Sequence, residues 1–384
     1  MLLPTISLSL LLNLIQDPQP NFIEQTIDNN ISIGYGLALG DVDGDGKPDI
    51  LLADKKQFVW YRNGDWKKFV MAENLTEYDN VCIAAEDING DGKVEVAVGA
   101  QWNPSETGDE KKSGAVFYLI PPEDRTQVWK SVELYHEPTI HRMRWIKSSK
   151  GKYYLAVLPL HGVGNKAGQG EGVNILMYAY PENIIANSPG YKLKSNMHLT
   201  HNLEIINSQD NQKNGLYIAG KEGVRFIAEQ YFPDTKATPV NLAGMDSAAG
   251  ELRFGREVAG KNFVTTIEPM HGQNLVVYSN NARVVIDNDL KEGHALATAD
   301  FLSAGSDQVV AGWRLPNKEG KVGIKLYVKK NPAATEWVSH LIDDNGMACE
   351  DLKVMDMDGD GKIDVVASGR ATHNVKIYWN KSSK

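Results

Sequence analysis

Asp41-Val-Asp-Gly-Asp-Gly-Lys-Pro-Asp49 is the stretch of sequence that decides the fold, because the same acidic pattern occurs three times. The other copies are Asp87-Ile-Asn-Gly-Asp-Gly-Lys-Val-Glu95 and Asp356-Met-Asp-Gly-Asp-Gly-Lys-Ile-Asp364. Each copy lies between two short apolar segments, such as Leu37-Ala-Leu before the first copy and Ile50-Leu-Leu after it. Two apolar segments joined by a glycine-containing turn are typical of a β-hairpin.

The hairpin belongs to a longer unit of four predicted strands that recurs along the chain. We count seven units, which begin near Tyr35, Val81, His141, His201, Glu251, His294 and Glu350. The last unit lacks a fourth strand, whereas Phe22–Asp28 resembles the fourth strand Trp337–Asp343. The sequence therefore predicts an all-β protein with a single seven-bladed β-propeller over residues 21–384, its last blade closed by Phe22–Asp28. Two or three separate β-domains are the alternative.

Composition narrows the classes of function. The 384 residues include 40 Lys and Arg against 49 Asp and Glu, which gives a formal charge of −9. This acidic balance argues against nucleic acid or an anionic membrane as the main partner, because both select basic surfaces. Two cysteines are too few for a disulfide scaffold. Cys82 and Cys349 fall on non-adjacent predicted blades, so we expect two free, buried thiols.

The N-terminal segment differs from the rest of the chain. Residues Met1 to Ile15 are almost wholly apolar, but the run is shorter than the roughly 20 residues that span a bilayer. It fits the apolar region of a signal peptide over residues 1–20, although the usual basic start is missing. An N-terminal strand or tail is the alternative. We expect export to the periplasm or the extracellular space, with no membrane span.

The three acidic turns have the composition of calcium loops. Oxygens at positions 1, 3 and 5, a backbone carbonyl at 7 and a carboxylate at 9 suit a hard cation with six to eight ligands. We expect two or three structural Ca²⁺ ions, on the face opposite the histidines described next. The predicted side-chain ligands are Asp41, Asp43, Asp45 and Asp49, then Asp87, Asn89, Asp91 and Glu95, and finally Asp356, Asp358, Asp360 and Asp364.

Histidines gather at one predicted mouth of the central channel. The innermost strand of a blade starts at this mouth and the second strand returns to it, so residues about 20 apart within a unit become neighbours. The predicted pairs are His141 with His161, His201 with Lys221, Glu251 with His271, His294 with Arg314, and Glu350 with Arg370. Five of the nine histidines occupy these positions. They form a candidate site, and polar residues at a wet channel mouth are the structural alternative.

The acidic repeats resemble the FG-GAP/VCBS family of propellers, a resemblance that implies fold and not activity. Residues 292–300, 309–314, 346–351 and 369–380 resemble something narrower, the propeller domain of fungal aldos-2-ulose dehydratase. That resemblance implies elimination of water or an alcohol from sugars. The fungal enzyme carries additional cupin domains, so any isomerase step that they perform is not implied here.

The resemblance and the mouth positions together predict a carbon–oxygen lyase acting on a keto-sugar or uronide. We expect two or three of His141, His201, His294 and Glu350 to bind a further divalent ion or the substrate oxyanion. His161 or His271 would be the base, and Arg314 and Arg370 would clamp the charged end.

The remaining substrate-binding candidates are Lys221, His373, Trp102 and Trp313. The two tryptophans can stack on a sugar ring or pack between blades. The expected partner is a small sugar or oligosaccharide, and we expect a monomer. The competing class of function is a calcium-stabilised, non-catalytic propeller that binds a glycan or a protein.

Overall fold

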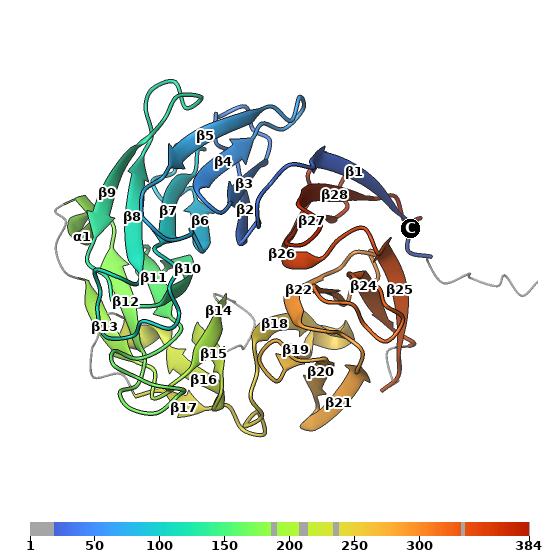
Figure 1. Cartoon of the computed structure of the whole chain (residues 1–384). Coiled ribbons are helices and arrows are strands. Elements are labelled where there is room, and N and C mark those ends of the chain that lie inside the picture. Colours follow the sequence, from blue (N-terminus) through green and yellow to red (C-terminus); the bar gives the residue numbers. More distant parts are fainter. Residues whose placement is uncertain (1–18, 186–189, 207–213, 233–237, 332–334, 384) are drawn as a thin grey trace, which may run out of the picture.

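The computed structural model describes residues 19–185, 190–206, 214–232, 238–331 and 335–383. In this part of the chain, the strands form seven antiparallel sheets of four strands each, arranged radially around a common centre (Figure 1). The first strand of each sheet lies innermost, so each sheet is one blade of a propeller. The predicted seven-bladed, all-β architecture is confirmed.

The first four blades follow the order of the chain. Blade 1 contains β2 (Gly36–Gly40), β3 (Asp49–Ala53), β4 (Gln57–Tyr61) and β5 (Lys68–Glu73). Blade 2 contains β6 (Cys82–Glu86), β7 (Glu95–Ala100), β8 (Ala115–Ile120) and β9 (Lys130–Leu134). Blade 3 contains β10 (Ile140–Lys147), β11 (Tyr153–Pro159), β12 (Asn174–Ala179) and β13 (Tyr191–Lys194). Blade 4 contains β14 (Thr200–Ile206), β15 (Gly215–Gly220), β16 (Gly223–Ala228) and β17 (Val240–Asn241).

Blades 5 and 6 also follow the order of the chain, whereas blade 7 combines strands from the two ends of the described chain. Blade 5 contains β18 (Glu251–Arg256), β19 (Asn262–Glu268), β20 (Asn274–Ser279) and β21 (Ala282–Asp287). Blade 6 contains β22 (Gly293–Ala299), β23 (Gln308–Trp313), β24 (Gly323–Lys329) and β25 (Trp337–Asp344). Blade 7 contains β26 (Cys349–Met355), β27 (Asp364–Gly369), β28 (Asn374–Asn380) and β1 (Phe22–Asp28). Each first strand begins within one residue of its predicted start.

The ring is closed in the way that the sequence predicts. β1 pairs antiparallel with β28, with Phe22 opposite Asn380, and the two strands lie side by side in Figure 1. The innermost strand of every blade contacts the innermost strand of the next, including β26 against β2. The alternative of separate β-domains is therefore wrong, because these contacts form one continuous ring.

Apolar side chains fill the space between neighbouring blades. Leu51 and Trp60 of blade 1 form one buried cluster with Val96 and Phe117 of blade 2. Because a blade is covered on both faces, consecutive residues of its middle strands are buried, as along the whole of β3. Burial of one large apolar side chain stabilises a protein by about 1.5–3 kcal/mol, so packing between blades holds the ring together.

The two cysteines are free and buried, as predicted. Cys82 lies opposite Gly99, and a β-carbon built at Gly99 would be 2.5 Å from the Cys82 sulfur. A β-carbon at Gly312 would likewise be 2.5 Å from the sulfur of Cys349, on the neighbouring blade. The thiols thus fill spaces that the two glycines leave between strands.

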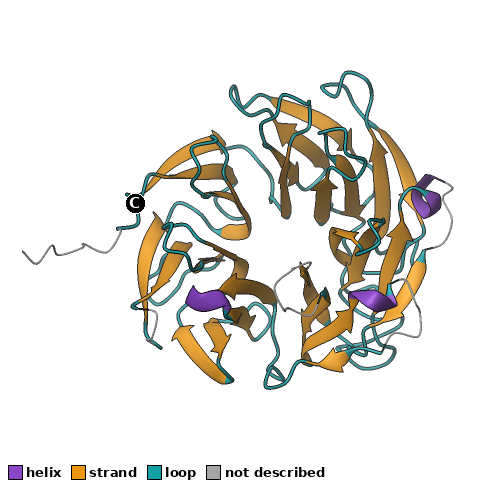
Figure 2. Cartoon of the chain, turned by 180° about the vertical axis from the view of Figure 1, so that it is seen from behind, coloured by secondary structure: helices purple, strands orange, loops and turns teal. Residues whose placement is uncertain are grey.

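Helical structure in the described chain is limited to short segments. They are α1 (Glu182–Ile185) and the 3₁₀ turns Glu229–Tyr231 and Val258–Gly260, which appear outside the innermost strands in Figure 2. None of the described helices is long and apolar enough to cross a membrane. The predicted signal peptide, residues 1–20, falls almost wholly on residues 1–18, which lie outside the described part.

Candidate functional site at the channel mouth

A β-bulge places a site residue at the start of four innermost strands. The strand register shifts at His141 in β10, His201 in β14, His294 in β22 and Glu350 in β26. In each case one residue lies unpaired between its neighbours, and a bulge of this kind redirects a side chain out of the regular alternation. The bulges bring these four side chains to the same end of the channel.

Three histidines converge at this mouth from blades 4, 5 and 6. One ring nitrogen from each of His201, His271 and His294 lies within 4.8 Å of the others. Nε2 of His201 is 2.8 Å from Nε2 of His271, and the His201 and His294 ring centroids are 5.2 Å apart. His271 lies in the turn after β19 in a left-handed conformation, with φ of 52°. We call these three residues the histidine cluster.

Hydrogen bonds determine the tautomers of two cluster members. Nδ1 of His201 is 2.8 Å from the carbonyl oxygen of Gly250 and 3.3 Å from a carboxylate oxygen of Glu251. Nδ1 of His294 is 2.6 Å from the carbonyl oxygen of Glu350. Because these oxygens only accept, Nδ1 carries the proton in both rings and Nε2 carries the lone pair. Metal-ligating histidines commonly hold their second nitrogen in this way. The lone pair of His201 accepts from Nε2 of His271.

Burial disfavours the charged form of three imidazoles at the mouth, those of His141, His271 and His294. Burial lowers the pKa of His141 and of His294 well below the usual value. Burial, His201 and the nearby Arg314 guanidinium lower the pKa of His271 to about 2. Burial alone would raise the pKa of Glu251, but its hydrogen bond with His201 and the charge of Arg253 lower that pKa to about 2. Neutral imidazole is the form that binds metal ions.

The donor set of the histidine cluster fits a metal ion that prefers imidazole. Tetrahedral zinc with bonds of about 2.1 Å places its nitrogen ligands roughly 3.4 Å apart. The shortest nitrogen–nitrogen distance in the cluster is 2.8 Å, so the His201 and His271 rings would separate by a few tenths of an ångström to hold such an ion. Side-chain rotation is enough for that change.

Two arginines share one buried carboxylate beside the cluster. Nη1 of Arg314 donates to both oxygens of Glu350, at 2.8 and 3.0 Å, and Nη1 of Arg370 donates to one of them at 3.2 Å. Nε of Arg314 also donates to Glu292 at 2.8 Å. Arg314 is therefore held on two sides, whereas the Arg370 side chain is 43% exposed and lies over the ring of Tyr35.

Residues outside the predicted set complete the mouth. Glu292 accepts a hydrogen bond from Arg314 and stands two positions before His294 in the sequence. Its closeness to a predicted site residue could have identified it from the sequence. Glu251, which the sequence paired with His271, instead supports His201. Asn202 donates to Glu251, and it follows the bulged His201 directly. The side of the strand on which Asn202 lies depends on the bulge at His201, and the sequence pattern does not reveal that bulge.

His141 lies next to the cluster without joining its hydrogen bonds. Its ring centroid is 4.7 Å from that of His201, and its other side stacks on Trp102 at 5.0 Å. Both of its ring nitrogens are buried and have no hydrogen-bond partner among the described residues. The Trp102 ring is half-buried, and this stacking uses one of its faces.

His161 lies apart from the cluster, in a second polar cavity of the same mouth. With residues 104–108 and 164–167 it lines a cavity of about 540 Å³. His161 forms a β-bridge with Leu199, two residues before His201 in the chain, and none of the cluster residues lines this cavity. Burial lowers the pKa of His161.

The structure does not bring three other predicted residues to the cluster. Trp313 is 1% exposed, its indole N–H donates to the carbonyl of Lys321, and it packs in a buried cluster between blades 5 and 6. Lys221 is exposed and lies over Gly168 in a blade 3 loop. His373 is exposed, and its Nδ1 is 2.9 Å from the carbonyl oxygen of Ser32. Trp313 thus fits the alternative of packing between blades, and the predicted substrate contacts of Lys221 and His373 stay predictions.

The acidic loops lie at the opposite ends of the innermost strands, between first and second strands. Carboxylate oxygens of Asp41, Asp43 and Asp45 lie within 4.8 Å of one another. The same holds for the matching loop at 356–360. Asp49 is buried, and its two oxygens accept the backbone N–H groups of Val42 and Asn63, each at 2.8 Å. The ninth position therefore braces its loop, whatever ion the first three carboxylates bind.

Two family models match the N-terminal part of the ring. Residues 20–98 match a model described as an FG-GAP-like repeat, and residues 83–119 match the FG-GAP repeat. Together they cover blade 1 and the first three strands of blade 2 up to residue 119, where two of the acidic loops lie. The chain thus contains FG-GAP repeats within a seven-bladed β-propeller. The narrower resemblance to aldos-2-ulose dehydratase stays a prediction, and no curated protein matches the chain.

Solved structures share the fold at low sequence identity. A chain of "Crystal Structure of Mitotic Checkpoint Complex" aligns with a TM-score of 0.58 and 11% identity, over 98% of this chain and 99% of that chain. Two structures of BBS1N in complex with ARL6DN, soaked with mercury and with lead, give TM-scores of 0.54 and 0.55 at 11% and 12% identity. They cover 94% and 93% of this chain, and 97% and 94% of theirs. At such identity the similarity shows the fold alone.

Proposed function

We propose that this propeller is a carbohydrate lyase or dehydratase that eliminates water or an alcohol from a keto-sugar or uronide. The observation that carries the proposal is the histidine cluster, in which two Nε2 lone pairs are fixed by backbone carbonyls next to the arginines that share Glu350. Elimination needs proton transfer and stabilisation of an enediolate, which neutral imidazole, guanidinium and a metal ion provide. A protein that only captures a glycan has no need for several histidines at the mouth.

The cluster would hold the metal ion in this proposal. His201, His271 and His294 supply three nitrogen ligands, a set that favours a transition metal such as zinc and leaves a coordination position open. Bound there, the ion would act as a Lewis acid on the carbonyl or carboxylate oxygen of the sugar. Arg370, the more exposed of the two arginines, would donate hydrogen bonds to the same end of the substrate, and Arg314 would keep Glu350 in place.

We assign the base to His161, one of the two histidines that the sequence predicted for this role. Its lowered pKa keeps the imidazole neutral and able to accept a proton near pH 7. The cavity that it lines is of a size for a sugar, and its bridge partner Leu199 stands two residues before His201 in the chain. His271 takes the ligand role instead, because its Nε2 faces His201.

The proposed reaction is balanced within the substrate. His161 takes the proton from the carbon next to the carbonyl or carboxylate, and the electrons of that C–H bond form a carbon–carbon double bond. The C–O bond to the leaving group breaks, and the imidazolium returns the proton to the leaving oxygen. One substrate molecule therefore gives one unsaturated sugar and one molecule of water or alcohol.

The test combines a substrate panel with metal analysis. Purified protein is incubated with 1,5-anhydrofructose, 3-keto-glycosides and uronide oligosaccharides while the absorbance of conjugated enones and unsaturated uronates is followed. We expect a rising signal with one class, a roughly hundredfold lower kcat for His161→Asn, and loss of bound transition metal for His201→Asn. His340→Asn, on the outer strand β25, is the matched control and should retain both metal and turnover.

A flat trace across the whole panel would overturn the elimination proposal. It would favour the competing class, a calcium-stabilised propeller that binds a glycan or a protein, and glycan arrays would then identify the ligand. If turnover occurs with no bound transition metal, His271 is not needed as a ligand, and the role of the base would return to it. The calcium loops, export from the cytoplasm and the monomeric state belong to this proposal as expectations, each open to direct measurement.

A further inference from the structure

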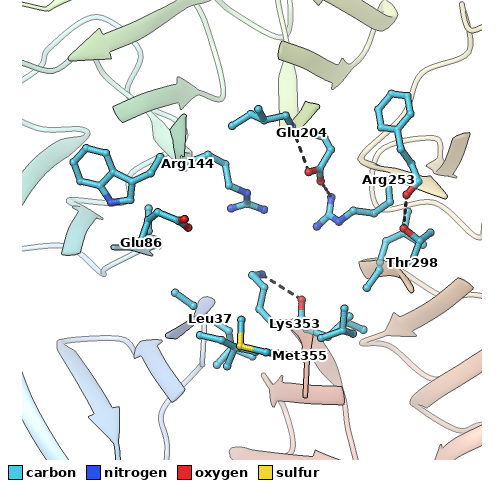
Figure 3. Close-up of a pocket in the computed structure, with 18 of the residues that line it drawn as sticks. Leu37, Glu86, Arg144, Glu204, Arg253, Thr298, Lys353 and Met355 are labelled. Atoms are coloured by element: carbon cyan, nitrogen blue, oxygen red, sulfur yellow. Dashed lines mark hydrogen bonds and ion pairs between the residues drawn. The ribbon is translucent and has the colours of Figure 1, made fainter. Parts of the chain in front are cut away.

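A second large cavity lies in the channel, at the opposite end from the histidines. It has a volume of about 600 Å³ and is lined by the later residues of all seven innermost strands (Figure 3). Between it and the mouth the channel narrows to a void of about 10 Å³ beside Arg142 and Asp351, room for about one water molecule. We call this space the lower cavity, and it is separate from the proposed catalytic site.

Three cationic side chains point into the lower cavity from three blades. Figure 3 shows Arg144, Arg253 and Lys353 directed toward the same central space from different sides. Arg253 pairs with Glu204 at 3.3 Å, and Lys353 pairs with Asp351 at 2.7 Å. These carboxylates hold two of the cations from one side and leave the side toward the cavity open.

Arg144 lacks a carboxylate partner. Its Nη1 donates to the carbonyl of Met143 at 3.0 Å, and it forms no ion pair with any residue in the described ranges. Burial and then the charge of Arg253 lower the pKa of Arg144. Arg144 is half-buried, and Glu204 and Asp351 offset part of this lowering without pairing with it. A guanidinium that faces a cavity with no paired carboxylate marks a place where an anion would be stabilised.

Lys353 is a second cation whose charged form is disfavoured at this cavity, although it pairs with Asp351. Burial lowers its pKa to about 8 despite the favourable Asp351, and Arg144 and Arg253 add to the lowering. Two further acidic residues line the cavity: Glu86 is exposed at its edge, and Asp307 pairs with Arg256 at 3.1 Å. The remaining lining is largely apolar, with Leu37, Trp145 and Phe254 among it. Apolar walls around a few convergent charges are typical of a small-molecule site.

We propose that the lower cavity binds a small organic or inorganic oxyanion, a carboxylate, phosphate or sulfate group, between Arg144, Arg253 and Lys353. Two guanidinium groups and an ammonium supply charge-assisted hydrogen bonds of the kind that such oxygens accept. The cavity volume admits an anion carried on a monosaccharide as well as a free ion. This site does not depend on the proposed elimination chemistry, because the narrow neck separates the two.

The test is isothermal titration of the full chain with three probes: inorganic sulfate, methyl phosphate and methyl glucuronide. We expect saturable binding of at least one probe, at least tenfold weaker in Arg144→Gln and in Lys353→Gln. Binding of the glucuronide alone would identify a uronate as the source of the anion, whereas binding of sulfate or methyl phosphate would identify a free ion or an ester. Lys330→Gln removes one exposed charge from β24's outer end and should bind as the parent protein does.

The proposal fails if no probe binds at millimolar concentration, or if Lys330→Gln weakens binding as much as Lys353→Gln. It also fails if His201→Asn abolishes binding while Arg144→Gln does not, because the anion would then lie at the mouth. Circular dichroism establishes that each variant is folded. If Arg144→Gln does not fold, Lys353→Gln and Arg253→Gln decide the question.

Discussion

Glu350→Gln is the substitution that most directly tests the architecture of the mouth. The Glu350 side chain is 3% exposed and accepts two hydrogen bonds from Arg314 and one from Arg370. Glutamine has nearly the same shape but no charge, and one of its two terminal atoms donates instead of accepting. One N–H group of Arg314 or Arg370 would therefore face another donor.

The expected cost follows from burial. Arg314 is 11% exposed, and after the substitution its remaining carboxylate is Glu292, which is itself 37% exposed. Breaking one side of a buried ion pair typically costs about 3–5 kcal/mol. We expect a fall in Tm of roughly 5 °C or more, since 1 kcal/mol corresponds to about 2–4 °C in domains somewhat smaller than this one.

The assay is thermal unfolding by circular dichroism in saturating calcium. Glu336→Gln is the matched control, because Glu336 pairs with Lys330 across an exposed 3.0 Å contact and its loss should leave Tm within error. Adding Arg314→Gln to Glu350→Gln should recover part of the loss, since the orphaned guanidinium is removed. If Glu350→Gln melts like Glu336→Gln, the buried network does not hold the mouth as the structure indicates.

Three further perturbations address other parts of the ring. Asp43→Asn should weaken calcium binding at least tenfold by titration. Asp300→Asn should leave it unchanged, because the corresponding loop of blade 6 has Leu302 and Ala304 at its third and fifth positions. Equal effects of the two substitutions would remove the calcium assignment. Gly312→Ala should lower the free energy of unfolding by about 1–3 kcal/mol, because the new methyl group overpacks against Cys349. Adding Cys349→Ala should restore part of that free energy, and no change in Gly312→Ala would refute the packing argument. The pKa of Lys353 is about 8 in the folded protein against 10.5 unfolded, so the unfolded state holds the extra proton in that window and the unfolding free energy should rise with pH there. Lys353→Gln should lack this rise in chemical denaturation.

The sequence by itself determined the repeating part of this protein. The acidic turns and the alternating segments are short-range patterns, so the strands, the seven blades and the start of each innermost strand followed from them. Closure by Phe22–Asp28 also followed, because an unpaired last blade requires a strand from elsewhere. The free state of both cysteines came from the same assignment of residues to blades.

The composition of the site was decided only by the tertiary structure. The sequence placed His141, His161, His201, His271 and His294 at one mouth but could not say which of them touch. One-residue bulges at three of these histidines redirect their side chains, and no local pattern announces a bulge. Which imidazoles meet, and which one enters a separate cavity, depends on that redirection.

The sequence likewise did not predict which charged residues from distant parts of the chain come together. Arg144, Arg253 and Lys353 are ordinary strand residues until the ring closes and points them at one another. The sequence also could not say whether Trp313 stacks on a sugar or packs between blades. Its burial depends on how the neighbouring blade packs against it. Repetition is encoded locally and can be read from the sequence, whereas convergence on a common axis exists only once the seven blades are assembled.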